Sequence, residues 1–180
     1  ESLKGRSSPK YNNTNRQIIL IGIARGMMYL HEHHVVHRDL KPGNVLLDSE
    51  FRPHIIDFGC SKYYDPKKDP STDFNGGTVY YMAPESISEN TYNEKTDVFA
   101  FGMLMYEVVA DKQLYSKYQN LNPIQFLTHF HEKKIPRPKF NFQLKKSIQV
   151  LIERCWSQDE NERPTFNEIV LLLKQNSEFV

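Results

Sequence analysis

The stretch His37-Arg38-Asp39-Leu40-Lys41-Pro42-Gly43-Asn44 places a carboxylate, an ammonium and an amide close together in one short loop. Two further motifs follow it in order, Asp57-Phe58-Gly59 and Ala83-Pro84-Glu85. Any one triplet of residues arises often by chance and carries little weight alone. The three motifs in this order and at this spacing are a specific signal, and they decide the fold class.

The three motifs together resemble those of eukaryotic-type protein kinases. Residues 37–44 match the whole catalytic-loop pattern, the second motif stands where the family places its metal-binding motif, and the third closes the activation segment. The resemblance implies an α+β, mainly α-helical, protein-kinase-like fold, here the large C-terminal lobe with a short β-hairpin. It predicts one partial kinase domain over residues 1–180, with the catalytic loop at 37–44 and the activation segment at 57–85.

The resemblance also implies a role for each polar residue of these motifs. Asp39 is expected to be the catalytic base that orients an acceptor hydroxyl, and Lys41 to stabilise the transferring phosphate of ATP. Asn44 and Asp57 are expected to bind Mg²⁺, because hard oxygen ligands suit that ion. Leu46 is expected to form an apolar floor beneath the adenine ring. Outside this pattern, loop and capping roles would be the ordinary interpretation of the polar residues.

The subclass follows from smaller resemblances. Lys41-Pro42 and Thr78 are typical of serine/threonine kinases, in which that threonine bonds the catalytic aspartate and lysine. Residues 97–102, Cys155-Trp156 and Arg163-Pro164 look like the large lobe of the tyrosine-kinase branch instead. This mixture resembles the tyrosine-kinase-like group, which mostly phosphorylates serine and threonine. It predicts an ATP- and Mg²⁺-dependent kinase whose partner is a protein substrate with a Ser/Thr acceptor.

Several other residues resemble structural positions of the family. His37 and Phe58 correspond to two packed members of its hydrophobic regulatory column. Asp97 corresponds to a buried aspartate that accepts backbone amides of the catalytic loop, since a buried carboxylate is costly without such bonds. Glu85 and Arg163 correspond to an internal ion pair that anchors the activation segment.

The small lobe of a kinase has no counterpart in the sequence. No Gly-rich phosphate loop, strand lysine or partner glutamate occurs, and Gly22 and Gly26 lie inside an apolar helical pattern. We expect a small lobe upstream, with a large lobe encoded alone as the other possibility. The alternative function is a pseudokinase-like scaffold or protein-binding module. By itself the chain is expected to lack kinase activity, to bind Mg-ATP no tighter than millimolar, and to self-associate through exposed residues including His37 and Phe58.

Hydrophobic spacing predicts mostly helices. They are expected from Thr14 or Asn15 to residue 30, over 95–110, 123–132 and 144–156, and from Thr165 onward. Thr165 and Glu168 form a capping-box pattern at the start of the last one. Aliphatic runs at 45–47 and 54–56 predict a hairpin. Residues 60–77 are polar and are expected to be mobile.

Composition limits the classes of partner and compartment. The 23 basic and 22 acidic residues are interspersed and leave a net charge of +1, which gives no case for nucleic acid or a membrane surface. The most apolar stretch, Ile18–Leu30, contains Arg25 and is shorter than the ~20 residues that a bilayer span requires. Two cysteines are few for a secreted domain, which favours a cytoplasmic location.

A histidine cluster offers a competing zinc hypothesis. His31, His33 and His34 precede His37, but the zinc-protease spacing requires a histidine where Val35 stands. We therefore interpret the cluster as a solvated helix end, where histidine is favourable near the C-terminal dipole.

Phosphorylation is a hypothesis for the activation segment. Ser71 and Thr72 lie in its polar stretch, where an added phosphate could pair with Arg38 and order the segment. Thr78 is the weaker candidate, because a phosphate there would obstruct the acceptor site.

Overall fold

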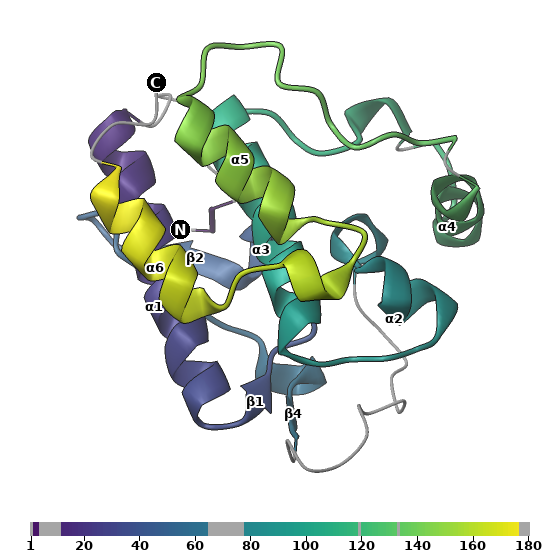
Figure 1. Cartoon of the computed structure of the whole chain (residues 1–180), viewed down its shortest axis with the longest axis horizontal. Helices are drawn as coiled ribbons and strands as arrows, with labels where there is room; N and C mark the ends of the chain where they lie inside the picture. The colour runs from purple at the N-terminus through teal and green to yellow at the C-terminus, as the bar shows by residue number, and fades with distance from the viewer. Residues whose placement is uncertain (1, 4–11, 65–77, 119, 133, 177–180) are drawn as a thin grey trace.

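Six α-helices and four short strands make up the part of the chain that the computed structural model describes, residues 2–3, 12–64, 78–118, 120–132 and 134–176 (Figure 1). The helices are α1 (Asn13–Glu32), α2 (Pro84–Ser88), α3 (Glu94–Ala110), α4 (Pro123–His131), α5 (Lys146–Cys155) and α6 (Phe166–Gln175). The strands are β1 (Val35–Val36), β2 (Val45–Leu47), β3 (Pro53–Ile55) and β4 (Lys62–Tyr63). Five 3₁₀ turns are η1 (Pro42–Asn44), η2 (Phe58–Cys60), η3 (Val79–Tyr81), η4 (Ser116–Tyr118) and η5 (Glu160–Glu162). The predicted α+β, mainly helical class is confirmed.

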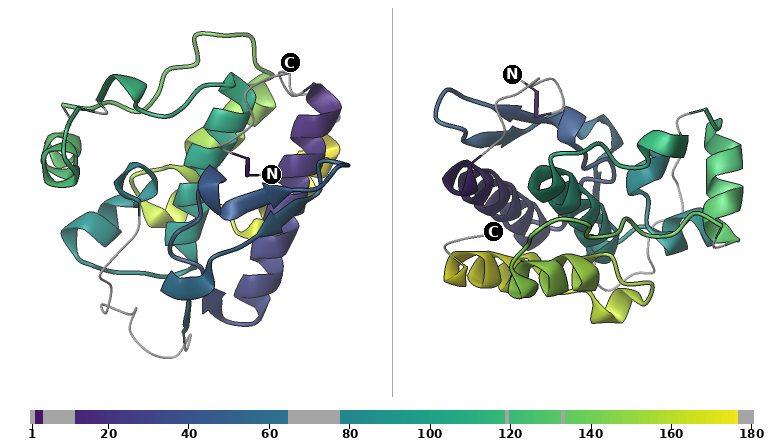
Figure 2. Two further views of the ribbon diagram at one scale, coloured as in Figure 1. Left: turned by 180° about the vertical axis from the view of Figure 1, so that it is seen from behind. Right: turned by 90° about the horizontal axis from the view of Figure 1, so that it is seen from above.

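The elements form three layers around α3. The view from above in Figure 2 shows the β2–β3 hairpin on one side of α1 and α3, with α5 and α6 on the other. α1 packs against α6, and α3 packs against α5. Almost every residue of α3 from Thr96 to Val109 is buried, and a helix that is apolar all round must be covered all round. α3 is therefore the core to which the loops that carry the site are attached.

Two glycines let α1 lie directly on the hairpin. Gly22 and Gly26 are one helical turn apart and face β3. A Cβ atom at Gly22 would lie 2.5 Å from Cγ of Pro53, and one at Gly26 would lie 2.8 Å from Cδ1 of Ile55. These glycines are therefore packing residues of a helix, which agrees with the sequence-based view that they are not a phosphate loop.

The first helix begins slightly earlier than the sequence indicated. Asn12 is its N-cap, and Oδ1 of Asn12 accepts a hydrogen bond from the Asn15 amide at 2.8 Å. The prediction of Thr14 or Asn15 was wrong because Asn12 is an equally good cap. Although α1 is 20 residues long, its sequence contains the charged residues Arg16 and Arg25. No helix in the described ranges is long and apolar enough to cross a membrane.

Two capping boxes start helices elsewhere. At α6, the Thr165 amide donates to Glu168 at 2.7 Å, and the Glu168 amide donates back to Thr165 at 3.3 Å, so that prediction is confirmed. A second box, between Asn122 and Gln125, starts α4. The structure begins α5 at Lys146, two residues later than expected, and no side chain caps this start.

The hairpin is confirmed with its second strand shifted by one residue. β2 and β3 are antiparallel, with Val45 opposite Ile55 and Leu47 opposite Pro53. Oδ1 of Asp48 accepts the amides of Glu50 at 2.8 Å and Arg52 at 2.9 Å, which closes the turn.

A strand pair contradicts part of the expected mobile stretch. β4 pairs with β1, and the Tyr64 amide donates to the carbonyl of His34 at 2.8 Å. Backbone pairing therefore orders residues 62–64, and Cys60 belongs to η2, which the low apolar content did not reveal. Ser71, Thr72 and the rest of 65–77 lie outside the described residues.

Candidate active site

The loop at 37–44 is fixed from below by Asp97 of α3. This carboxylate is 1% exposed and accepts the backbone amides of His37 at 2.8 Å and Arg38 at 2.9 Å, one on each oxygen. Arg38 has a φ of 68°, a conformation that needs such support in a residue other than glycine. The predicted contact between Asp97 and the loop is confirmed. Nε2 of His31 also lies 2.9 Å from the Asp97 carboxylate, which the sequence did not reveal.

The Asp39 carboxylate is the centre of the polar site. It is 8% exposed, and its Oδ2 accepts from Nζ of Lys41 at 2.5 Å and from Nδ2 of Asn44 at 2.9 Å. Its Oδ1 accepts from the hydroxyl of Thr78 at 3.1 Å and from the Thr78 amide at 3.2 Å. Nζ of Lys41 reaches the Thr78 hydroxyl at 2.8 Å. The predicted bonds of the threonine to the aspartate and the lysine are therefore present, and they fix the direction of the carboxylate.

Asn44 and Asp57, the predicted metal ligands, are brought together by the hairpin. The Ile56 amide donates to the carbonyl of Asn44 at 2.9 Å, so Asp57 follows directly beside Asn44. Nδ2 of Asn44 is bound to Asp39, which directs its Oδ1 away from that carboxylate. Asp57 is exposed, has a φ of 64°, and caps η2 through the Gly59 amide. Both side chains offer oxygen atoms, and this donor set suits Mg²⁺.

The apolar residues beside these ligands differ in exposure. Leu46 is 36% exposed, whereas its neighbours Val45 and Leu47 are buried, so Leu46 presents an apolar surface above the hairpin. Phe58 is 48% exposed, so the expectation that it is packed is only partly met. His37 is fully buried, and the prediction that it faces solvent was wrong. The Phe58 ring covers it at a centroid distance of 5.3 Å.

The histidine cluster does not form a metal site. Among residues 12–64 and the other described ranges, no group of three His, Cys, Asp or Glu side chains could hold a metal ion. His31 is committed to Asp97, and His33 is exposed, as predicted for a helix end. His34 instead is part-buried between the rings of Tyr63 and Tyr64, because the strand pair covers it.

Charges near the site act on two neighbouring side chains. Burial, followed by the negative charges of Asp39 and Asp57, raises the pKa of the Cys60 thiol, which makes it a poor nucleophile. Burial and then the Glu107 carboxylate raise the pKa of Tyr81, whose hydroxyl donates to Glu107 at 3.0 Å. Sequence reasoning missed the bond between Tyr81 and Glu107, because neither residue belongs to a recognised motif. The proximity of Tyr81 to the third motif was the only signal.

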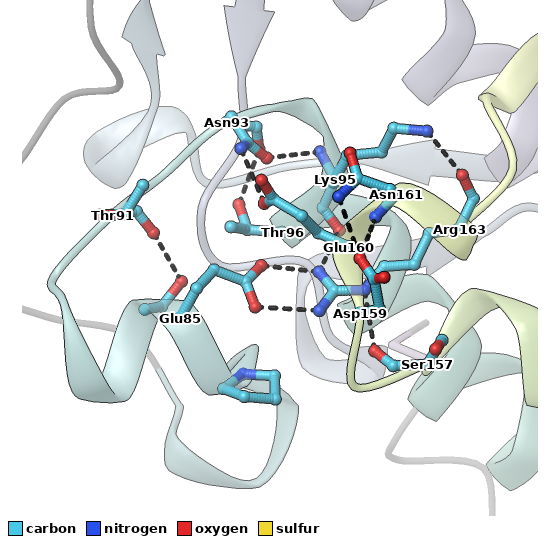
Figure 3. Close-up of polar contacts among 12 residues, drawn as sticks. Glu85, Thr91, Asn93, Lys95, Thr96, Ser157, Asp159, Glu160, Asn161 and Arg163 are labelled. Atoms are coloured by element: carbon cyan, nitrogen blue, oxygen red, sulfur yellow. Dashed lines mark hydrogen bonds and ion pairs between the residues drawn. The ribbon is translucent and has the colours of Figure 1, made fainter.

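The predicted ion pair between Glu85 and Arg163 is confirmed (Figure 3). The buried guanidinium donates to the two carboxylate oxygens of Glu85 at 2.6 and 2.8 Å. It also donates to the carbonyls of Ser157 and Lys95, both at 3.0 Å, and lies 5.1 Å from the centre of the Phe99 ring. Each of its three nitrogen atoms therefore donates at least one hydrogen bond, and these bonds join α2 to α3 and to the segment before α6.

Breaking this pair is expected to destabilise the fold strongly. Arg163→Leu leaves Glu85 without its partner in a mostly buried place, and we expect a loss of about 3–5 kcal/mol in the free energy of unfolding. Arg154→Leu removes an exposed arginine 3.9 Å from Glu168 and should cost less than about 1 kcal/mol. Urea unfolding of both variants measures the difference. Equal losses would mean that the buried pair has no special role.

A family model for the protein kinase domain matches residues 3–172. The chain belongs to the protein kinase family. It is 36% identical over 162 residues to a serine/threonine/tyrosine-protein kinase of Arabidopsis thaliana, an alignment that covers 90% of this chain and 40% of that kinase.

Two other kinases of this family come from Dictyostelium discoideum. One is an RGS domain-containing serine/threonine-protein kinase, 36% identical over 154 residues, covering 86% of this chain and 13% of the relative. The other is a dual specificity protein kinase, 36% identical over 161 residues, covering 86% and 22%. The chain thus spans less than half the length of each relative.

Proposed function

We propose that these residues form the large-lobe part of an ATP- and Mg²⁺-dependent protein serine/threonine kinase that transfers the γ-phosphate of ATP to a protein hydroxyl. The domain would extend over residues 1–180, with the catalytic loop at 37–44 and the activation segment at 57–85. The observation that carries the proposal is the Asp39 carboxylate, which Lys41, Asn44 and Thr78 hold in one orientation. Retention of all these residues, with Asp57, favours a kinase over a scaffold without phosphotransfer.

Asp39 acts as the base in this proposal. Its carboxylate accepts the hydrogen bond of the acceptor hydroxyl and orients that oxygen for in-line attack, and it takes up the proton as the new bond forms. Lys41 lies beside this carboxylate at 2.5 Å, so its ammonium is placed where negative charge on the transferring phosphate needs stabilisation. These groups are held before substrate arrives, so little reorganisation opposes the reaction.

Nucleotide and metal binding involve the hairpin. Asn44 and Asp57 would hold Mg²⁺, and Lys41 and Leu46 would contact ATP together with them. The ion supplies neutralisation of phosphate charge. The exposed surface of Leu46 supports its role as the floor for adenine.

A small lobe would complete the cleft from above. The exposed Leu46 and Phe58 favour the prediction that the large lobe alone binds nucleotide weakly and self-associates. A cytoplasmic location stays a prediction.

The hydrogen bonds of Thr78 bear on regulation. Its hydroxyl contacts both Asp39 and Lys41, so a phosphate on Thr78 would occupy the place of the acceptor. This supports the view that Thr78 is not an activating site. Phosphorylation of Ser71 and Thr72 stays a hypothesis.

Acceptor specificity gives the test of the proposed function. A protein in which a small lobe precedes these residues is assayed with labelled ATP and peptides that differ only in a Ser, Thr or Tyr acceptor. We expect serine or threonine to be preferred over tyrosine by about tenfold or more in kcat/KM. The relatives' names include dual specificity, so equal transfer to tyrosine is the result that would contradict this specificity. Absence of any transfer would favour the scaffold.

A further inference from the structure

A groove outside the polar site lies between the segment that follows α3 and the segment that follows α4. Its volume is about 440 Å³, within the range of ligand sites in proteins. In Figure 1 these two connections run between the α3–α5 pair and α4. Apolar and aromatic side chains form part of the wall: Tyr106, Leu114, Tyr115, Tyr118, Pro136 and Pro138.

The groove concentrates positive charge. Lys112, Lys117, Arg137 and Lys139 line it, and none of its lining residues is acidic. Among the ion pairs of the described residues none involves these four side chains, and Glu85 acts on Arg137 only through its charge. The whole chain has a net charge of only +1, so this gathering of basic side chains in a groove without acidic lining residues is a local feature. Such a groove is complementary to an anion.

Arg137 is the rigid member of the set. Its guanidinium lies 4.6 Å from the centre of the Phe99 ring and 4.8 Å from that of Phe130, so aromatic rings cover it. Stacking of this kind leaves the N–H edge for acceptors in the guanidinium plane, and a carboxylate fits that edge with two parallel hydrogen bonds. Burial lowers the pKa of Arg137, yet an arginine stays charged at neutral pH.

One wall of the groove is in contact with the acceptor side of the molecule. The Tyr115 ring lies 6.3 Å from that of Tyr80, centre to centre, and Tyr80 follows Thr78 by two residues. Tyr115 also has a φ of 50°, a strained conformation that its buried packing maintains. A polypeptide that passes Thr78 could therefore continue along η3 toward the groove.

We propose that the groove binds an acidic segment of the protein substrate, with carboxylates against Arg137 and the lysines and apolar side chains against the tyrosines and prolines. That the bound segment belongs to a substrate rests on the proposed kinase function. A polypeptide fits better than nucleic acid, because the basic residues line one short groove and not an extended track for phosphates.

Peptide binding to a protein in which a small lobe precedes these residues, measured without ATP, tests the groove without catalysis. The probe is a short fluorescein-labelled peptide of alternating glutamate and alanine, followed by fluorescence anisotropy. Lys117→Glu/Lys139→Glu should weaken binding by about tenfold or more. The matched control, Lys146→Glu/Lys174→Glu, reverses the charge of two exposed lysines, one in α5 and one in α6. It should change the affinity for the peptide by less than about twofold. Thermal unfolding confirms that both variants are folded, and Arg137→Lys, which keeps the charge but loses the planar edge, should also weaken binding.

Three results would overturn the proposal. The first is equal weakening by both double variants, which would mean general charge attraction. The second is equal binding of a lysine-alanine peptide. The third is a single-stranded oligonucleotide that binds more tightly than the acidic peptide and depends on the same lysines.

A kinetic measurement then tests the link to substrate. With a small lobe present, a serine peptide extended by the acidic run should show a higher KM with Lys117→Glu/Lys139→Glu, while the unextended peptide keeps its KM and kcat. An unchanged KM for the extended peptide would disprove the substrate role. The anisotropy assay contains no ATP, so failure of phosphotransfer leaves the binding result readable, and the two proposals fail separately.

Discussion

Asp39→Asn is expected to reduce turnover by about 10²–10⁴-fold, the range for loss of a positioned base. The asparagine keeps the size of the side chain but cannot take up the proton of the acceptor hydroxyl. In the unaltered protein Lys41, Asn44 and Thr78 all donate hydrogen bonds to the Asp39 carboxylate. The NH₂ group of the asparagine cannot accept from any of them. We expect folding and Mg-ATP binding to be preserved in a protein that includes a small lobe. Steady-state kinetics with a serine or threonine peptide measure the change.

Asp48→Asn is the matched control for this substitution. Asp48 likewise accepts hydrogen bonds with its carboxylate, from two backbone amides in the turn between β2 and β3. The same charge is removed there, outside the polar site, and turnover should change by less than about twofold. Unchanged turnover in Asp39→Asn would remove Asp39 from its role. A loss of similar size in both variants would trace the effect to charge and not to the base.

The polar site could be predicted because its residues lie in compact motifs. Asp39, Lys41 and Asn44 belong to one loop, and their mutual hydrogen bonds follow once that loop is formed. Contacts between residues far apart in the sequence could be predicted only where the family pattern includes both partners, as for Glu85 and Arg163. The bond from His31 to Asp97 joins residues far apart in sequence, and no motif relates them.

Local rules failed where backbone pairing or neighbouring caps decide the outcome. The strand pair of β1 and β4 is too short to show a hydrophobic period, so residues 60–64 were expected to be mobile. Asn12 and Thr14 are both acceptable caps, and only the reach of the Asn12 side chain distinguishes them.

The basic groove illustrates a different limit. Its lysines and Arg137 come from two separate connections. Over the whole sequence, 23 basic residues are interspersed with 22 acidic ones. Net charge therefore predicted no charged surface. The fold gathers the basic residues by bringing the segments after α3 and α4 together. Amino-acid composition carries no information about which segments become neighbours in the fold.

The two aspartates of the site are held in different ways. Asp39 is buried and accepts hydrogen bonds from its neighbours, so its position is fixed before any ligand arrives. Asp57 is exposed and its carboxylate accepts only the Gly59 amide, at 3.4 Å, among the hydrogen bonds of the described residues. A carboxylate with so little protein contact keeps most of its acceptor capacity, as a metal ligand requires. Removal of Asp57 should therefore affect metal-dependent chemistry far more than stability.

Asp57→Ala is expected to abolish Mg²⁺-dependent phosphotransfer while the core stays folded. Alanine at a φ of 64° is itself unfavourable by roughly 1–2 kcal/mol, so Asp57→Asn is the cleaner variant, because asparagine tolerates that conformation and can keep the cap to Gly59. Asp57→Ala should lose transfer at every magnesium concentration that supports the unaltered protein, whereas Asp57→Asn, which keeps a neutral oxygen donor but no charge, should transfer far more slowly and need more magnesium. Titration of activity against magnesium, with unfolding measured in parallel, separates the two effects.

Asp159→Ala provides the control, because Asp159 caps η5 through the Asn161 amide just as Asp57 caps η2 through Gly59. It removes the same kind of cap from a 3₁₀ turn that none of the predicted site residues belongs to, so activity and its magnesium dependence should stay unchanged. Activity that survives in Asp57→Asn with an unaltered magnesium requirement would show that this carboxylate is not a ligand. The exposed Asp57 would then be only a cap, and Asn44 would need another oxygen donor to share the ion.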